Sequence, residues 1–135
     1  MNKQKEIQKL KEDLNKFNKR LEELEKKETL EEWNGLMWSD TQTEGNWHEA
    51  MKFANDCIDG GHSDWRLPTV SELHNVFDYE TGEPKIGGFS DEFYWSSTEF
   101  SGNPAYAWIV SLYRGSTNYS TKFTDTRYVR CVRRV

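Results

Sequence analysis

The strongest constraint on the fold is a heptad pattern at the start of the chain. Residues 3 to about 29 contain no glycine and no proline, and their apolar residues are spaced 3, 4, 3, 4 and 3 apart. This is the spacing of the a and d positions of a coiled coil, sustained over nearly three heptads. A stripe this narrow does not stabilise a lone helix, so we expect it to be buried against another surface. The six positions are Ile7, Leu10, Leu14, Phe17, Leu21 and Leu24.

Two surfaces could cover this stripe, namely copies of the same helix or the domain that follows it. We expect self-association into a homo-oligomer, with these six residues in the interface. Isoleucine occupies only one a position, at Ile7, and leucine occupies the others, which does not favour a dimer. Phe17 is a bulky residue at a d position, which suits a wider core. The sequence therefore favours a parallel trimer.

Charge divides the chain at the same place. Residues 1–29 hold nine Lys or Arg against seven Asp or Glu, a net +2, whereas residues 30–135 hold nine against sixteen, a net −7. We therefore expect an oligomerisation helix over residues 1–29 and one globular domain over residues 30–135. Phosphate contacts need clustered cations, so we expect no nucleic-acid partner. One basic run would fall on both faces of a strand, which favours a partly structural role: Arg127, Arg130, Arg133 and Arg134.

The chain lacks the sequence features of a membrane-inserted protein. No segment approaches the roughly 20 apolar residues that span a bilayer. Its first residues are charged and unlike a signal peptide. We expect no membrane insertion, and these features do not assign the protein to a cellular compartment.

Two helices are predicted in the domain, each by an N-terminal capping box. Asn46 is followed three residues later by Glu49, and Thr69 is followed by Glu72. Gly60 and Gly61 would end the first helix, and the second would run to about Asp78. The buried side of the first helix is expected to hold Trp47, Ala50, Met51, Ala54, Cys57 and Ile58. That of the second is expected to hold Val70, Leu73, Val76 and Phe77.

The stretch "DWRLPTVSEL" leads into the second helix. Pro68 fixes the entry of the chain just before the capping box at Thr69. We interpret the stretch as part of the scaffold and expect Arg66 to pair with an acid close by.

The rest of the domain is predicted to form strands. "WNGLMWSD" indicates a short strand with a turn at Asn34-Gly35. In "AYAWIVSLYRG" the residues Trp108, Val110 and Leu112 alternate with Ile109, Ser111 and Tyr113, which indicates a half-buried strand. "RYVRCVRRV" alternates in the same way at the end of the chain. Helices followed by antiparallel strands indicate an α+β fold.

The two cysteines, Cys57 and Cys131, lie far apart in the sequence. They lack the CxxC spacing of zinc or redox sites. Two buried thiols and a single bridge from an early helix to the last strand are both compatible with this spacing.

The order of six segments resembles the Lcl C-terminal domain family. They are "GLMWSD", "NWHEAMKFANDC", "DWRLPTVSEL", "YWSST", "AYAWIVSL" and "YVRCVR", and the likeness covers about residues 33 to 134. The resemblance implies a C-type-lectin-like fold and a binding module that is commonly displayed on a trimeric stalk. It also implies a cell-surface, secreted or phage-particle setting, with sulfated polysaccharides as ligands of some adhesin members. Finally, it implies a disulfide between Cys57 and Cys131.

Metal-dependent and catalytic chemistry are not expected. The three histidines, His48, His62 and His74, are scattered, without the close ligand pairs of a zinc site. Lectin calcium sites use a Glu-Pro-Asn-like loop, but Lys85 follows Glu83-Pro84 here. No G-x-S-x-G turn surrounds Ser96 or Ser97. We expect no metal, no cofactor and no enzymatic activity.

The residues after "WSST" are the best candidates for a binding surface. Tyrosines accompanied by Ser, Asn and Arg supply rigid aromatic area together with adaptable hydrogen bonding. We expect non-catalytic recognition of a surface glycan or protein receptor, as in adhesion, by an oligomer. The alternative is a structural trimerisation or stalk-tip assembly protein. The candidate binding residues are Phe100, Asn103, Tyr106, Tyr113, Arg114, Thr117, Asn118 and Tyr119.

Overall fold

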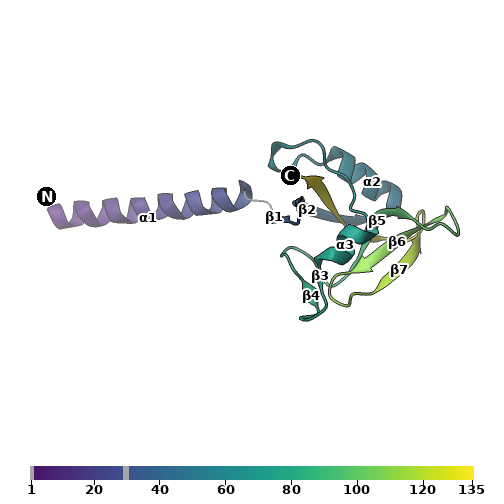
Figure 1. The fold of residues 1–135 in the computed structure, drawn as a ribbon. Coiled ribbons are helices and arrows are strands. Elements are labelled where there is room, and N and C mark those ends of the chain that lie inside the picture. Colours follow the sequence, from purple (N-terminus) through teal and green to yellow (C-terminus); the bar gives the residue numbers. More distant parts are fainter. Residues whose placement is uncertain (1, 29–30) are drawn as a thin grey trace. The chain divides into compact units, whose positions relative to one another are not determined.

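The computed structural model describes the backbone of residues 2–28 and 31–135 and the side chains of residues 2–21 and 32–135. The chain divides into two units, Met1–Leu30 and Glu31–Val135. The first unit contains one helix, α1 (Lys3–Glu28), as the heptad pattern predicts (Figure 1). Five of the six heptad residues have described side chains, and all five are exposed. The side chain of Leu24 lies outside the described residues.

The second unit is built on a mostly antiparallel sheet of six strands. Its strand order is β1-β2-β8-β5-β6-β7, and only the contact between β5 and β8 is parallel. The strands are β1 (Glu31–Trp33), β2 (Leu36–Gly45), β5 (Phe93–Glu99), β6 (Tyr106–Ser111), β7 (Thr117–Thr121) and β8 (Arg127–Arg134). A second, two-stranded sheet pairs β3 (Phe77–Asp78) with β4 (Glu83–Pro84). With the helices, this confirms the α+β class.

Local signals in the sequence set the ends of the helices and the first turn. Both capping boxes form, at the start of α2 (Trp47–Asp56) and of α3 (Val70–Val76). A short 3₁₀ helix, η1 (Asp59–Gly61), follows α2. Asn34 and Gly35 both adopt positive φ, 53° and 77°, which suits the tight turn between β1 and β2.

The predicted buried side of the first helix is wrong at two positions. Met51 is 40% exposed and Ile58 is 74% exposed. Cys57 is already extended, with φ −65° and ψ 134°, so α2 ends at Asp56 and Ile58 no longer follows the helical period. The second helix likewise ends before Asp78, at Val76, although its predicted apolar residues do pack inward.

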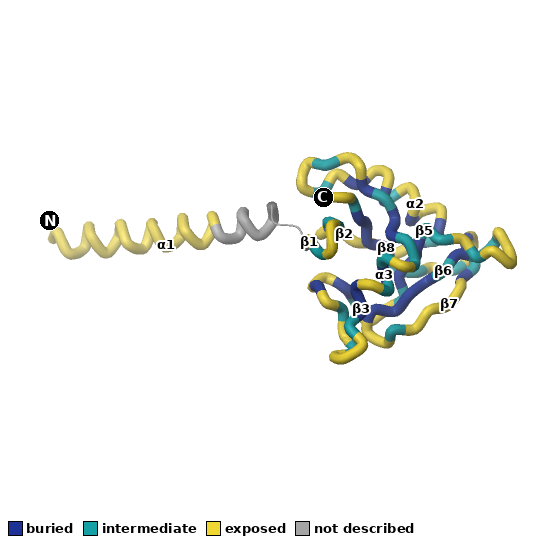
Figure 2. Tube along the Cα trace, in the orientation of Figure 1, coloured by how far each residue is buried: buried dark blue, intermediate teal, exposed yellow. Residues whose placement is uncertain are grey.

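The two helices pack on opposite faces of the sheet. Leu73 and Val76 of α3 share a buried cluster with Tyr94, Val110 and Val132. Cys57, at the end of α2, interacts instead with Cys131. Residues 131 and 132 are adjacent in β8, and adjacent strand residues point to opposite faces. The sheet is therefore buried on both sides, and Figure 2 shows the buried residues concentrated in its central strands.

This double burial corrects the prediction of a half-buried strand at residues 106–113. Ile109, Val110 and Leu112 are all buried, with exposures of 2% or less. Trp108, which the alternation places with the core residues, is only partly buried. A period-2 pattern assumes that one face of the strand is exposed to solvent. Here a helix covers each face of the sheet, which explains why neighbouring residues of the strand are both buried.

The stretch "DWRLPTVSEL" serves the scaffold, as expected. Arg66 and Val132 exchange both main-chain hydrogen bonds, at 2.9 and 2.8 Å. The predicted acidic partner of Arg66 is Glu72, at 2.7 Å. The indole of Trp65 donates to the carbonyl oxygen of Asp59. These contacts tie the entry of α3 to the last strand.

Most of the basic run is structural. Arg130 is buried and donates to the carbonyl oxygens of Ser39 and Gly87, and Arg133 pairs with Asp64 at 2.6 Å. Arg127 donates to the hydroxyl of Ser120.

No helix in the described part of the chain is long and apolar enough to cross a membrane.

Candidate binding surface

Four aromatic rings gather on one face of the β6–β7 hairpin. Phe100 and Tyr119 are stacked, with ring centroids 4.6 Å apart and planes 16° apart. Trp108 meets both rings edge-on, at 5.4 and 5.9 Å. Tyr106 completes the group by meeting Tyr119 at 5.3 Å. We call these four residues the aromatic cluster.

Sheet register and a tight turn bring these rings together. Trp108 lies directly opposite Tyr119, and Tyr106 is two residues from Trp108 on the same face. Phe100 arrives through the turn after β5, where its amide donates to the carbonyl oxygen of Tyr106 at 3.0 Å. A side chain at Gly102 would place its Cβ only 2.8 Å from the Phe100 ring. The turn therefore needs a glycine there if the ring is to lie on the cluster.

The cluster combines packed and accessible aromatic area. Tyr119 is 47% exposed, while the other three rings are partly buried. Edge-to-face and offset contacts fix the rings relative to one another, so little conformational entropy remains to be lost on binding. The surface is therefore already organised for contact with a flat or apolar ligand group.

The outer edge of β7 is partly closed by side chains. Amides of Ser111 and Lys122 donate across to residues 116 and 105, so residues 117, 119 and 121 of β7 turn their main-chain groups outward. Of these, the amide of Tyr119 donates to the Asn118 side chain at 2.8 Å. The amide of Thr121 donates to the Asp125 carboxylate, also at 2.8 Å. The hydrogen bond from the Ser120 hydroxyl is the main cause that holds the pKa of Asp125 below its usual range, and the bond from the Thr121 amide adds to it.

The eight predicted binding residues fall into two groups. Phe100, Tyr106 and Tyr119 are in the aromatic cluster, and Asn103 lies in the adjoining turn, where its side chain accepts from the amide of Ala105. Asn118 lies beside Tyr119 and points its oxygen at the β7 edge.

The other three lie near the turn between β6 and β7. Tyr113 donates its hydroxyl to the carbonyl oxygen of Phe89 at 3.2 Å. Arg114 lies 3.8 Å from Asp91 in an exposed ion pair. Thr117 is hydrogen-bonded to His74 at 2.6 Å. Among the described ring contacts, none joins Tyr113 to the aromatic cluster.

Sequence reasoning missed one member of the cluster, Trp108, because strict alternation assigned it to the core. The signal that could have found it is the pairing of two strands. Trp108 and Tyr119 lie directly opposite each other in the hairpin, and this is evident only once the register is known.

The cysteines are free thiols in the structure, where the family resemblance implies a disulfide. Burial, followed by the neighbouring Cys57, raises the pKa of Cys131 to about 12. Burial is also the main cause of the raised pKa of Cys57. Both groups are therefore held protonated near neutral pH, which makes them poor nucleophiles.

The histidines and serines considered above have structural contacts. Ser96 is buried and donates to the carbonyl oxygen of Trp108 at 2.7 Å. The rings of His48 and Phe123 are in tilted contact, with centroids 4.5 Å apart, and His74 contacts Thr117. Among the described side chains, those of residues 2–21 and 32–135, no group of three His, Cys, Asp or Glu is placed to hold a metal ion.

The fold and this surface define an α+β domain with a preorganised aromatic face. The sequence model of the Lcl C-terminal domain matches residues 27–133 of the chain. The chain belongs to this family, as the resemblance of the six segments indicates. Membership suggests a surface-associated domain. No match was found among curated proteins.

Proposed function

We propose that this protein is a non-catalytic recognition module, displayed as an oligomer, that binds a surface glycan or a protein receptor through the aromatic cluster. The observation that carries the proposal is the set of ring contacts among Phe100, Tyr106, Trp108 and Tyr119. A C-type-lectin-like identity of the fold belongs to the same proposal and is supported by the family membership. A bacterial or phage surface is the setting that this family suggests.

Ligand contact would be made by side chains at this surface. The partly closed edge of β7 leaves few main-chain groups for an added strand, because Asn118 and Asp125 occupy two outward amides. Aromatic rings with amide and hydroxyl groups beside them suit a ligand with both flat apolar faces and polar substituents. The high thiol pKa of Cys131 and the buried contacts of Ser96 support a function without covalent chemistry.

Multivalent display would come from α1. The five described heptad residues are 44–67% exposed, which is a large apolar stripe to leave in water. In a parallel, in-register assembly, g positions lie beside e positions of the next heptad on a neighbouring helix. This places Glu6 beside Lys11 and Arg20 beside Glu25, both with opposite charge. The proposal is a parallel homotrimer, in which weak single contacts gain avidity.

A glycan and receptor-protein array probed with the fluorescently labelled full chain tests recognition. Tyr119→Ala should weaken any saturable binding about tenfold, because one aromatic contact contributes on the order of 1 kcal/mol beyond area burial. Tyr79→Ala is the matched control, since Tyr79 is 75% exposed and lies outside the cluster. Equal loss in both variants would refute the assignment of the surface. Absence of any binding would favour the assembly function.

Light scattering on the full chain tests oligomerisation separately. Leu14→Asp places a charge in the heptad seam and should give monomers, because an unpaired charge in an apolar interface is costly. Asn15→Asp adds the same charge one residue outside the seam and should leave the trimer intact. A monomeric wild-type chain would rule out the oligomer and its avidity. Binding with wild-type single-site affinity by monomeric Leu14→Asp would show that recognition does not depend on assembly.

A further inference from the structure

At the edge of the sheet far from β7, strand β2 is only partly covered by β1. β1 covers β2 only at residues 36–38. In the irregular stretch of β2 between Trp38 and Gln42, Thr41 donates from both its amide and its hydroxyl to the Asp59 carboxylate, at 2.7 and 2.8 Å. Beyond Thr41, β2 continues to Gly45, and none of the described strands pairs with this part of it on the side of β1.

The ladder on the other side of β2 shows which groups are open. Val132 of β8 exchanges its main-chain hydrogen bonds with Arg66, so the residues that alternate with it, including Val129, turn toward β2. Val129 lies opposite Thr43 in the register. Thr43 therefore bonds to β8, and Gln42 and Glu44 turn their N–H and C=O groups outward. In the part of the chain that the structure describes, these outward groups have no main-chain partner.

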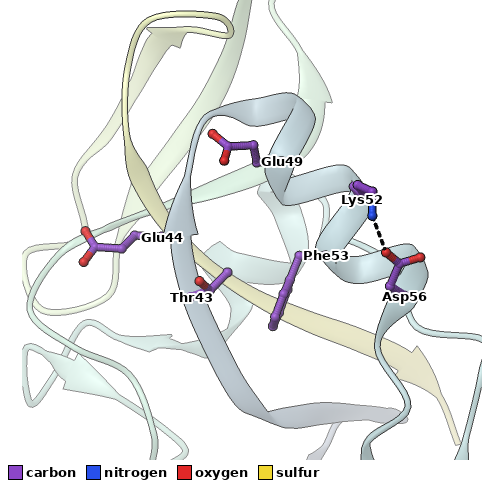
Figure 3. Close-up of a pocket in the computed structure, with 6 residues that line it drawn as sticks. All are labelled: Thr43, Glu44, Glu49, Lys52, Phe53 and Asp56. Atoms are coloured by element: carbon purple, nitrogen blue, oxygen red, sulfur yellow. Dashed lines mark hydrogen bonds and ion pairs between the residues drawn. The ribbon is translucent and has the colours of Figure 1, made fainter.

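A groove runs beside this open edge. It has a volume of about 340 Å³ and lies between β2 and α2 (Figure 3). Thr43 and Phe53 point toward one another across it, and Phe53 is only half-buried. The groove thus offers aromatic and methyl surface directly next to unpaired main-chain groups. Its lining residues are Thr43, Glu44, Glu49, Lys52, Phe53 and Asp56.

The charge of the groove favours a cationic occupant. Its lining residues include three acidic residues and one lysine, although the carboxylate of Glu44 points away from Phe53, on the other face of β2 (Figure 3). Lys52 is already paired with Asp56 at 2.9 Å, and Glu49 accepts the amide of Asn46 at 3.0 Å. The carboxylate of Glu44 has no hydrogen bond or ion pair to another described residue, and it is exposed. The net charge of −7 on the domain also attracts a cationic partner at longer range.

We propose that β2 accepts a short extended segment of a protein partner as an added strand at Gln42–Glu44, and that this segment carries an apolar residue between basic ones. Strand addition pairs the outward N–H and C=O groups, and alternate side chains give specificity. The partner residue opposite Thr43 shares its face and meets Phe53. Its neighbours lie on the face of Glu44, where a basic side chain pairs with that carboxylate.

The two sheet edges differ in the feature that decides strand addition. At β7 the outward amides of Tyr119 and Thr121 are occupied by side chains, whereas at β2 those of Gln42 and Glu44 have no partner among the described residues. The strands β8, β5 and β6 lie between β2 and β7, so this site is separate from the aromatic cluster. Either binding activity can fail without the other.

Fluorescence polarisation of a labelled peptide against the full chain tests the proposal. The probe is the capped heptapeptide Lys-Thr-Lys-Val-Lys-Thr-Lys. Two further versions carry N-methyl groups on one or the other alternating set of amides. Because strand amides point alternately to the two sides, we expect one version to bind at least about tenfold more weakly and the other to bind like the parent. Equal binding by all three peptides, or no binding by the parent, would overturn strand addition.

Variants of the protein locate the site. Glu44→Pro removes an outward N–H that the β2–β8 ladder does not use, and it should weaken binding at least about tenfold. Glu44→Lys reverses the local charge without touching the main chain, so it tests the site even if the proline variant does not fold. Glu92→Lys is its control, because Glu92 is an exposed carboxylate before β5. Equal weakening by both lysine variants would show non-specific attraction and contradict the proposal.

Hydrogen exchange provides a readout that charge alone would not move. The amides of Gln42 and Glu44 should exchange about tenfold or more slowly in the presence of saturating peptide, because each becomes hydrogen-bonded. The amide of Tyr119, at the far edge, should be unchanged. Unchanged exchange at Gln42 and Glu44 with bound peptide would refute the added strand.

Discussion

Replacing Arg66 by alanine tests how the entry of α3 is held. The Arg66 guanidinium donates from Nη1 and Nη2 to the two carboxylate oxygens of Glu72, at 2.7 Å each. Glu72 Oε1 also accepts the amide of Thr69 at 2.8 Å, which is one half of the capping box. One carboxylate thus joins the "WRLP" corner to the first turn of the helix.

The cost of Arg66→Ala follows from these contacts. Hydrogen bonds to charged groups contribute about 1.5–3 kcal/mol when they are well buried. The Arg66 side chain is 41% exposed, so solvent screening lowers this figure, while Glu72, at 18% exposed, is left with only its cap contacts. We expect the free energy of unfolding to fall by about 1–2 kcal/mol. Glu72→Ala should cost about 1 kcal/mol more, because the cap is lost as well.

The effect of pH has a definite sign. Burial alone would raise the pKa of Glu72, but hydrogen bonds from Arg66 and Thr69 outweigh it and hold the pKa below its usual range. A carboxylate with a lowered folded-state pKa stabilises the fold above its unfolded value, about 4.3. That contribution is lost as the pH falls through the lower folded value. The difference in stability between wild type and Arg66→Ala should therefore shrink below about pH 4.

Urea unfolding followed by circular dichroism, at pH 7 and at pH 3, measures both effects. Lys52→Ala is the control, because it breaks an exposed ion pair with Asp56 and should leave the midpoint unchanged. Ligand affinity per folded molecule should be the same for wild type and Arg66→Ala. An unchanged midpoint at pH 7, or a loss that does not diminish on acidification, would refute the reasoning.

Two further predictions concern the thiols and a glycine. Cys57 and Cys131 should resist labelling by iodoacetamide at pH 7 until the domain unfolds, as measured by mass spectrometry; rapid labelling of the folded chain would contradict this. The free energy of unfolding should decline as the pH rises above about 8.5, because the thiol ionises in the unfolded chain while burial holds the pKa of Cys131 at about 12 in the folded one. Gly88→Ala should cost about 2 kcal/mol or more in urea unfolding, since its φ is 90° and a Cβ there would lie 2.9 Å from the Arg130 guanidinium. Gly61 has a similar φ of 79°, but a Cβ there would have no atom within 4 Å. An equal loss of stability in Gly61→Ala and Gly88→Ala would therefore show that backbone strain alone, and not contact with Arg130, causes the loss.

The sequence predicted those parts of the fold that depend on neighbours along the chain. Each capping box needs two residues three positions apart, as in Asn46 with Glu49, and the Asn34-Gly35 turn needs only its own two residues. Tertiary context decided the errors. Ile58 follows a helical period that ended one residue earlier, at Cys57, and no local pattern marked that end.

The candidate binding surface was predicted in part for the same reason. Phe100, Tyr106 and Tyr119 were found by composition, whereas Trp108 was lost to an alternation argument that assumes one solvated face. Thr117 was included as one of the loop and outward strand positions after "WSST", but it contacts His74 of α3. Which residues lie opposite one another in a hairpin, as Trp108 and Tyr119 do, is not specified until the register is fixed.

The hydrogen bonding of the two sheet edges shows most clearly that the residue pattern of a strand does not by itself predict what the strand can bind. β7 forms one edge of the sheet, and residues 42–45 of β2, beyond its pairing with β1, form part of the other. Both segments contain threonine and other polar residues, and their sequences do not distinguish an open edge from a closed one. The distinction arises from residues outside the ladder, namely Asp125 in the loop after β7 and Asp59 in η1, each of which occupies a specific amide. Asp59 bonds to Thr41. The outward main-chain groups of Gln42 and Glu44 have no main-chain partner among the described residues. A protein that gained nothing from this opening could close it by extending β1 or by adding one capping side chain, as β7 does. The open segment beside an acidic groove is therefore the feature of this domain for which a partner strand offers a physical reason.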